Sequence, residues 1–138
     1  MKLKYAADLN QHDNCPPTSA KPCSRNAFRF VFSPITDGRN FLPIAKLNPR
    51  RKLQPHNQCR AFALSMWATQ GQAESAYATF LSGFPNFDKT SGTHLASGRL
   101  VASDGRAGGE RSDGHFSFFE SASADLEAKF SVLHKLAP

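Results

Sequence analysis

Hydrophobic and polar positions alternate with a period of two in a short segment near the start of the chain. Between Asn26 and Ser33, phenylalanines occupy every second position from Phe28 to Phe32, and alanine, arginine and valine occupy the alternate positions. Because the side chains of a β-strand point to opposite faces in turn, this pattern predicts a strand with an aromatic face. Residues 93–101 and 115–120 are also strand-like, and we expect them to pair as antiparallel neighbours across the glycine-rich loop 103–114.

Apolar side chains that recur every three or four residues predict the longest helix of the chain. These side chains are Ala73, Ala76, Tyr77, Phe80, Leu81 and Phe84. Thr69 and Gln72 have the spacing of a capping box, in which each side chain satisfies a polar group at the helix start. Gly83 supplies a stop signal at the C-terminal end, and Pro85 prevents continuation of the helix. We therefore expect one helix over about residues 70–82, directly after a strand over residues 58–67.

Two weaker patterns complete the expected order of elements. Residues 41–47 contain a proline, which cannot donate a hydrogen bond within a ladder, and they are interpreted as an edge strand. Residues 122–136 mix helix-favouring and alternating stretches, and we expect a turn followed by a strand. This order predicts a single α+β domain over residues 26–138, with a mostly antiparallel sheet and one principal helix packed on it. Residues 1–25, which lack periodicity, are expected to form an extended or partly disordered N-terminal arm.

The length and the cysteine content limit the class of protein. A chain of 138 residues suits one domain, and it has no apolar run long enough for a membrane span or a signal peptide. We therefore expect a cytoplasmic protein that does not bind membranes. The odd number of cysteines indicates free thiols; they are Cys15, Cys23 and Cys59. Cys15 and Cys59 each follow a histidine by three residues, but no closed set of four zinc ligands is recognisable, so we expect no metal.

Basic residues are concentrated in the first part of the chain. Residues 1–60 carry eleven lysines and arginines against three acids, whereas residues 61–138 carry six against eight. Such a basic half attracts anionic partners. We therefore expect a small binding or interaction module that uses residues 39–60 to contact a protein, a nucleic acid or a second copy of itself, without a cofactor. The expected partner-binding residues are Lys46, Arg50, Arg51, Lys52 and Arg60.

Three polar residues on predicted strands carry an enzymatic alternative. Arg29, Ser65 and Glu120 follow one another along the chain. Their order resembles that of mono-ADP-ribosyltransferases, which take an arginine from an early strand, a serine or threonine from a central strand and a late glutamate. The resemblance implies an NAD-using effector or toxin, in which Arg29 holds the dinucleotide phosphates, Ser65 supplies the strand hydroxyl and Glu120 is the catalytic carboxylate. The Ser-Thr-Ser and paired-glutamate patterns common in that group are absent.

Proton transfer or nucleophilic catalysis is a further alternative. The candidate side chains are His94, His115, Cys59 and Ser65. His94 and His115 lie near the starts of two strands that we expect to pair, so their imidazoles would converge at one end of the sheet. A catalytic Cys59 would need a lowered thiol pKa, which an apolar strand opposes.

Overall fold

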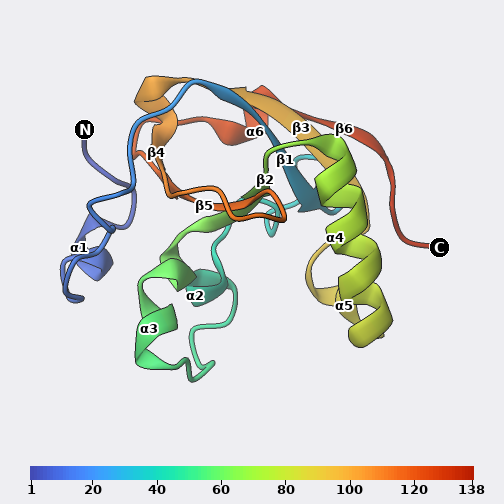
Figure 1. Ribbon diagram of the computed structural model, residues 1–138, viewed down its shortest axis with the longest axis horizontal. Coiled ribbons are helices and arrows are strands. Elements are labelled where there is room, and N and C mark those ends of the chain that lie inside the picture. Colours follow the sequence, from blue (N-terminus) through green and yellow to red (C-terminus); the bar gives the residue numbers. More distant parts are fainter.

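The computed structural model describes all 138 residues and places six strands in one sheet (Figure 1). The strands are β1 (Arg25–Val31), β2 (Leu64–Trp67), β3 (His94–Leu100), β4 (Gly105–Ala107), β5 (His115–Glu120) and β6 (Phe130–Lys135). Their order across the sheet is β4-β5-β2-β1-β3-β6, and every neighbouring pair is antiparallel.

One long helix and several short ones accompany the sheet. The long helix is α4 (Gln70–Gly83), with 14 residues. The short ones are α1 (Ala6–Leu9), α2 (Ile44–Leu47), α3 (Pro55–Gln58), α5 (Phe87–Thr90), α6 (Leu126–Lys129) and the 3-10 turns η1 (Arg60–Phe62) and η2 (Ala102–Asp104). None of these helices has the length and apolar character that crossing a bilayer requires. The predicted α+β fold, with an antiparallel sheet and one principal helix, is confirmed.

The predicted start of α4 is present in the structure. Thr69 Oγ1 accepts a hydrogen bond from the Gln72 backbone N–H (3.2 Å) and donates one to Gln72 Oε1 (3.0 Å). Ala73 and Tyr77 are buried on the face of the helix that meets the sheet. The Tyr77 hydroxyl donates to the carbonyl of Gly92 (2.9 Å), which ties α4 to the segment that leads into β3. Local cap chemistry and apolar spacing therefore position this helix as predicted.

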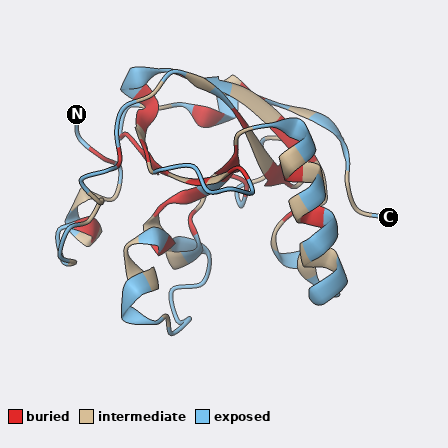
Figure 2. Ribbon diagram, viewed as in Figure 1, coloured by how far each residue is buried: buried red, intermediate tan, exposed pale blue.

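The buried residues follow the strands of the sheet (Figure 2). The largest core cluster contains Ala27, Val31, Leu64, Met66, Ala96, Leu100, Ala107, Phe116, Phe118, Leu126 and Phe130. A second cluster joins the N-terminal segment to the sheet; its members are Leu3, Leu9, Ala20, Ala63 and Phe119. Burial of apolar surface by the first 24 residues therefore attaches them to the domain.

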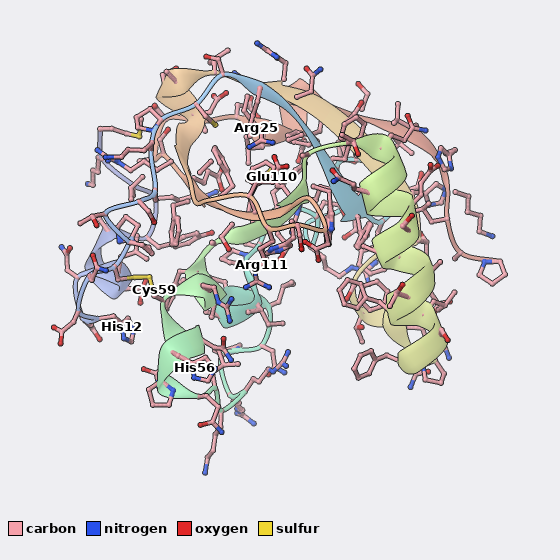
Figure 3. The ribbon with its side chains drawn as sticks, viewed as in Figure 1. His12, Arg25, His56, Cys59, Glu110 and Arg111 are labelled. Atoms are coloured by element: carbon pink, nitrogen blue, oxygen red, sulfur yellow. A yellow bond between two sulfur atoms is a disulfide. The ribbon has the colours of Figure 1, made fainter.

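A disulfide reinforces this attachment. Cys15 and Cys59 are bonded to each other, with their Cα atoms 5.7 Å apart although 44 positions separate them in the sequence (Figure 3). Cys23 is the one free cysteine. The prediction of three free thiols is therefore wrong for Cys15 and Cys59. The odd count was a poor guide because the packing of the N-terminal segment, which local sequence does not encode, brings two of the thiols together.

Two predicted strands have different structures. Residues 41–47 do not form a strand, because α2 begins after Pro43, whose carbonyl accepts hydrogen bonds from the backbone N–H groups of Lys46 and Leu47 (2.9 and 3.0 Å). A proline suits the start of a helix, where N–H groups lack intrahelical partners. The strand expected over residues 58–67 begins only at Leu64, since the residues before it form the end of α3 and the turn η1.

The expected pairing of the two later strands is also wrong. β5 pairs with β2 and β4, whereas β3 pairs with β1 and β6. The predicted loop over residues 103–114 contains β4, in which Gly105 has a φ of +156° and lies so close to the Phe119 carbonyl that a Cβ would collide with it. Strand partners are chosen by long-range packing of the faces, which the alternation of one segment does not specify.

Candidate functional site

The sheet opens between its two central strands. β1 and β2 share a single residue pair, Phe28 with Trp67, whereas β1 and β3 pair over seven positions. Arg29 spans the opening from β1. Its Nη1 donates a hydrogen bond to the carbonyl of Ser65 on β2 (2.7 Å), and its Nε donates to the carbonyl of Asn40 (2.9 Å). Arg29 therefore connects the two central strands where their own ladder stops.

A cleft of about 290 Å³ lies at this opening. In Figure 1, α2 lies to one side of β2 and α4 and α5 lie to the other, and residues of all three helices line the cleft. Its charged and hydrogen-bonding side chains include Arg29, Arg39, Arg60, Ser65 and His115. Besides the His115 imidazole, its aromatic side chains are Phe30, Phe32, Trp67, Phe80 and Phe87. Three arginines and no carboxylate line the cleft, so its charge is positive.

Arg29 carries a charge that has no anionic hydrogen-bond partner. Burial in the wall of the cleft lowers the pKa of Arg29 to about 10, and the negative charge of Glu120 opposes this shift. The guanidinium therefore stays protonated at neutral pH. No carboxylate lies within the 4.0 Å that defines an ion pair with it. Because desolvated charges are normally paired, the free N–H groups of Arg29 suit an anionic ligand.

Arg39 and Arg60 stand at the cleft with different local contacts. Arg39 donates to both carboxylate oxygens of Asp37 (3.0 and 2.9 Å), and its guanidinium lies 3.6 Å from the centre of the Phe32 ring. Arg60 donates from Nη2 to the side-chain oxygen of Asn57. Arg60 has no carboxylate partner, so it adds a second uncompensated positive charge to the cleft.

Ser65 and His115 form a hydrogen-bonded pair in the cleft. They come from adjacent strands, β2 and β5, and His115 Nε2 lies 3.1 Å from Ser65 Oγ. The Trp67 ring meets the imidazole edge to face, with 5.2 Å between the ring centres. Burial lowers the pKa of His115, and the neighbouring positive charge of Arg111 lowers it further. The imidazole is therefore neutral at pH 7, so Nε2 can accept the Ser65 hydroxyl proton in the tautomer protonated on Nδ1.

Glu120 lies outside this cleft. It is five positions after His115 on the same strand, so its side chain projects from the opposite face. There it is 5% exposed, and its Oε2 lies 3.6 Å from Nζ of Lys4, while its Oε1 has no hydrogen-bond partner. Burial raises the pKa of Glu120, and Lys4 opposes that shift. Arg29 and Ser65 thus line the cleft and Glu120 does not, although Glu120 is near enough to Arg29 for their charges to interact.

The expected convergence of His94 with His115 is wrong. β2 and β1 lie between the strands that carry these histidines, and His94 Nδ1 instead contacts the Thr93 hydroxyl (2.8 Å). Cys59 has no thiol for catalysis because it is disulfide-bonded. No group of three or more histidine, cysteine, aspartate or glutamate side chains that could hold a metal ion is present.

The basic residues of segment 39–60 divide between different surroundings. Lys46 pairs with Asp8 (Nζ to Oδ2, 3.1 Å), and Arg60 belongs to the cleft. Three others project into solvent from the connection between α2 and α3, without a carboxylate partner; they are Arg50, Arg51 and Lys52. Outside the cleft, these three consecutive residues therefore form a cluster of unpaired positive charge.

Asn40, which no sequence pattern singled out, shapes one wall of the cleft. Asn40 is 2% exposed, and its side chain accepts from the Phe32 N–H (2.6 Å) and donates to the Phe32 and Ile35 carbonyls (2.8 and 3.0 Å). These bonds fold the segment after β1 back on itself and aim the Asn40 carbonyl at Arg29. The nearby Asp-Gly turn signal marks a change of direction but does not reveal these bonds.

Comparisons with protein-family models, with curated proteins and with solved structures found no match. The chemistry of the site therefore follows from its own geometry. That geometry is a positively charged, partly aromatic cleft at the opening of the sheet, in which Arg29 is hydrogen-bonded to the Ser65 carbonyl and the Ser65 hydroxyl to His115.

Proposed function

We propose that this protein binds a nucleotide in the cleft between β1 and β2. The observation that carries the proposal is the lining of the cleft, which holds three arginines and no carboxylate. Phosphate groups are the anions that guanidinium groups bind best, through paired, charge-assisted hydrogen bonds. Arg29 is the expected phosphate ligand, because its charge is partly desolvated and has no anionic hydrogen-bond partner.

The aromatic side chains of the cleft support a ligand that also carries a flat ring. Phe80 and Phe87 stack with their ring centres 5.0 Å apart and are only partly buried. Phe32 is also partly buried, beside Arg39. A pocket that combines aromatic walls with a few fixed polar groups is typical of cofactor and nucleotide sites. A volume of about 290 Å³ suits part of a dinucleotide, with the remainder outside the cleft.

The resemblance to mono-ADP-ribosyltransferases makes NAD the first nucleotide to test. Arg29 and Ser65, two of the three residues that carry this resemblance, line the cleft together. Glu120 does not line it, so the proposed reaction, transfer or hydrolysis of an ADP-ribosyl group, uses no carboxylate from that residue.

Tryptophan fluorescence tests nucleotide binding directly. The chain has one tryptophan, Trp67, and it lines the cleft. NAD, ADP-ribose, AMP and pyrophosphate are titrated into the wild type and into two variants, Arg29→Met and the control Arg99→Met, which removes an equal charge from the exposed side of β3. Loss of the charged hydrogen bonds of Arg29 should weaken phosphate-containing ligands by about tenfold to a hundredfold. The control should bind like the wild type.

Two results would overturn the nucleotide proposal. One is the absence of any change in Trp67 fluorescence, and of any binding heat, at millimolar concentrations of all four ligands. The other is equal affinity in the wild type and in Arg29→Met, because a ligand that is indifferent to Arg29 does not place its phosphate in the cleft.

A second candidate function uses the exposed basic cluster for an anionic protein or nucleic-acid partner. The observation that favours it is that Arg50, Arg51 and Lys52 have no carboxylate partner and lie on one connection. Arg51 and Lys52, with Lys46, also line a second hollow of about 630 Å³. Contacts between such cations and phosphates give affinity that falls with salt.

A single-stranded oligonucleotide tests this second candidate. For single strands, each phosphate contact contributes about 0.7 to the slope of log K against log salt. Reversal of the three charges to glutamate should therefore lower the magnitude of this slope by about 2. The matched control reverses Lys89, Arg99 and Lys135, which are exposed on other elements. Affinity that is independent of salt, or that both triple variants lower equally, contradicts a specific role for the cluster.

A further inference from the structure

The cleft holds one pair of side chains whose geometry suits proton transfer. Ser65 Oγ and His115 Nε2 are 3.1 Å apart, within the range in which a general base takes a proton from a hydroxyl group. Ser65 is exposed and His115 is partly buried, and both residues line the cleft.

The strands fix the position of this pair. Ser65 is opposite Ser117 in the β2–β5 ladder, and Trp67 is opposite His115, so the serine and histidine are diagonal neighbours on one face of the sheet. The Trp67 ring packs against the imidazole, and the His115 backbone N–H donates to the side chain of Asp113 (3.0 Å). A site built on paired strands holds its groups more rigidly than one built on loops.

The charged groups around His115 keep its imidazole ready to accept a proton. Arg111, from the loop before β5, and Arg60, from η1, oppose protonation, while Asp113 favours it. β2 contributes uncharged Ser65 and Trp67 to these surroundings. The net result, with burial as the largest cause, is a pKa of His115 below its ordinary value of 6.5.

We propose that Ser65 and His115 are the proton-transfer pair of the cleft, in which Ser65 passes the proton of an attacking water to Nε2 of His115. This inference rests on the proposed function, with NAD as the ligand. A serine and a histidine then remove the proton from the attacking water, because no carboxylate lines the cleft to do so.

The simplest reaction is hydrolysis of NAD to ADP-ribose and nicotinamide. The bond between the ribose C1′ and the nicotinamide nitrogen breaks, and nicotinamide leaves with the electron pair, which neutralises its ring. The oxygen of water forms the new bond to C1′. One proton of the water passes to Ser65 Oγ as the Ser65 proton passes to His115 Nε2, and the imidazolium then releases it to solvent. Arg29 holds the phosphates and takes no part in the proton transfer.

Three variants test the pair. His115→Gln removes the proton acceptor and keeps a side chain that can hydrogen-bond Ser65, and Ser65→Ala removes the relay at an exposed position. The matched control is His94→Gln, since His94 is also on a strand and contacts a hydroxyl, that of the preceding Thr93, but lies outside the cleft. For each protein, the Kd for NAD is measured by Trp67 fluorescence, and nicotinamide release is measured as a function of pH.

The expected result separates catalysis from binding. The wild-type kcat/KM rises with pH through the pKa of His115 and is flat above it. His115→Gln lowers kcat by about 100-fold, as expected for loss of a general base. Its Kd for NAD is that of the wild type, and its kcat/KM does not rise with pH in this range. Ser65→Ala lowers kcat by a smaller factor and keeps the rise, because His115 still titrates. His94→Gln behaves like the wild type.

The outcomes that overturn the inference are distinct from those that overturn the proposed function. If the wild type does not bind NAD, both fail. If it binds NAD but releases no nicotinamide at any pH, nucleotide binding stands and the proton-transfer pair is refuted. If His115→Gln hydrolyses NAD at the wild-type rate, or with the wild-type dependence on pH, only the roles of Ser65 and His115 are refuted.

Discussion

Removal of the Cys15–Cys59 disulfide should lower the stability of the domain strongly. The bond closes a segment that contains β1 and the loop that forms one wall of the cleft, and the two cysteines are 44 positions apart. In the chain-entropy account, such a cross-link removes conformations from the unfolded state and leaves the folded state largely unchanged. The perturbation is the double variant Cys15→Ser, Cys59→Ser.

The magnitude follows from the length of the closed segment. A loop of 44 residues corresponds to a loss of about 13 cal/mol/K of chain entropy in the unfolded state, or about 4 kcal/mol at 25 °C. Domains are typically stable by about 5–15 kcal/mol, so this is a large fraction of the total. With a urea dependence of about 2 kcal/mol/M, the unfolding midpoint should fall by about 2 M.

Urea unfolding followed by Trp67 fluorescence measures the effect. Thiol titration of the denatured wild type should first detect one free cysteine without reductant and three with it. Cys23→Ser is the control, because Cys23 forms no disulfide and its replacement should not produce this shift. Equal midpoints for the oxidised wild type and the double variant would show that the disulfide does not stabilise the domain, and three reactive thiols without reductant would show that it does not form.

Three further predictions concern the core and are measured by urea unfolding. Tyr77→Phe removes the hydroxyl that donates to the Gly92 carbonyl and should cost about 1 kcal/mol; an unchanged midpoint would contradict it. Gly98→Ala places a Cβ 2.7 Å from the Phe130 ring and should cost about 1–3 kcal/mol, whereas a more stable variant would show that the ring moves aside freely. Burial raises the pKa of Glu120 above 4.5, so the native state binds the proton more tightly than the unfolded state does. The contribution of Glu120 to stability therefore falls as the pH rises from 4.5 through the raised pKa. Glu120→Gln should remove that fall, and a variant with the pH profile of the wild type would contradict this prediction.

Part of the candidate site could be anticipated from the chain alone. The alternation around Arg29 predicts a strand in which Arg29 shares a face with Ala27 and Val31, and β1 contains these residues. Ser65 is predicted in a strand that leads into a capped helix, and it lies in β2, directly before α4. The predicted role of Glu120 depended on its facing the same cleft. Its five-residue offset from His115 places these two side chains on opposite faces, but only the pairing of β5 with β2 shows which face meets Ser65.

Elements whose signals are local can be predicted from the chain alone. The alternation of β1, the apolar spacing of α4 and the cap at Thr69 depend on residues at most a few positions apart, so they could be predicted without knowledge of the rest of the chain. The single-domain α+β class followed from these elements.

Features that depend on contacts between distant segments could not be predicted from local patterns. The strand order joins segments that are separated by other elements, and the Cys15–Cys59 bond and the hydrogen bond between Ser65 and His115 join residues 44 and 50 positions apart. Such contacts form because the faces of strands and helices bury each other in one arrangement among many that share the same local patterns. The cleft exists for the same reason, since β1 and β2 meet at one residue pair and then separate around Arg29.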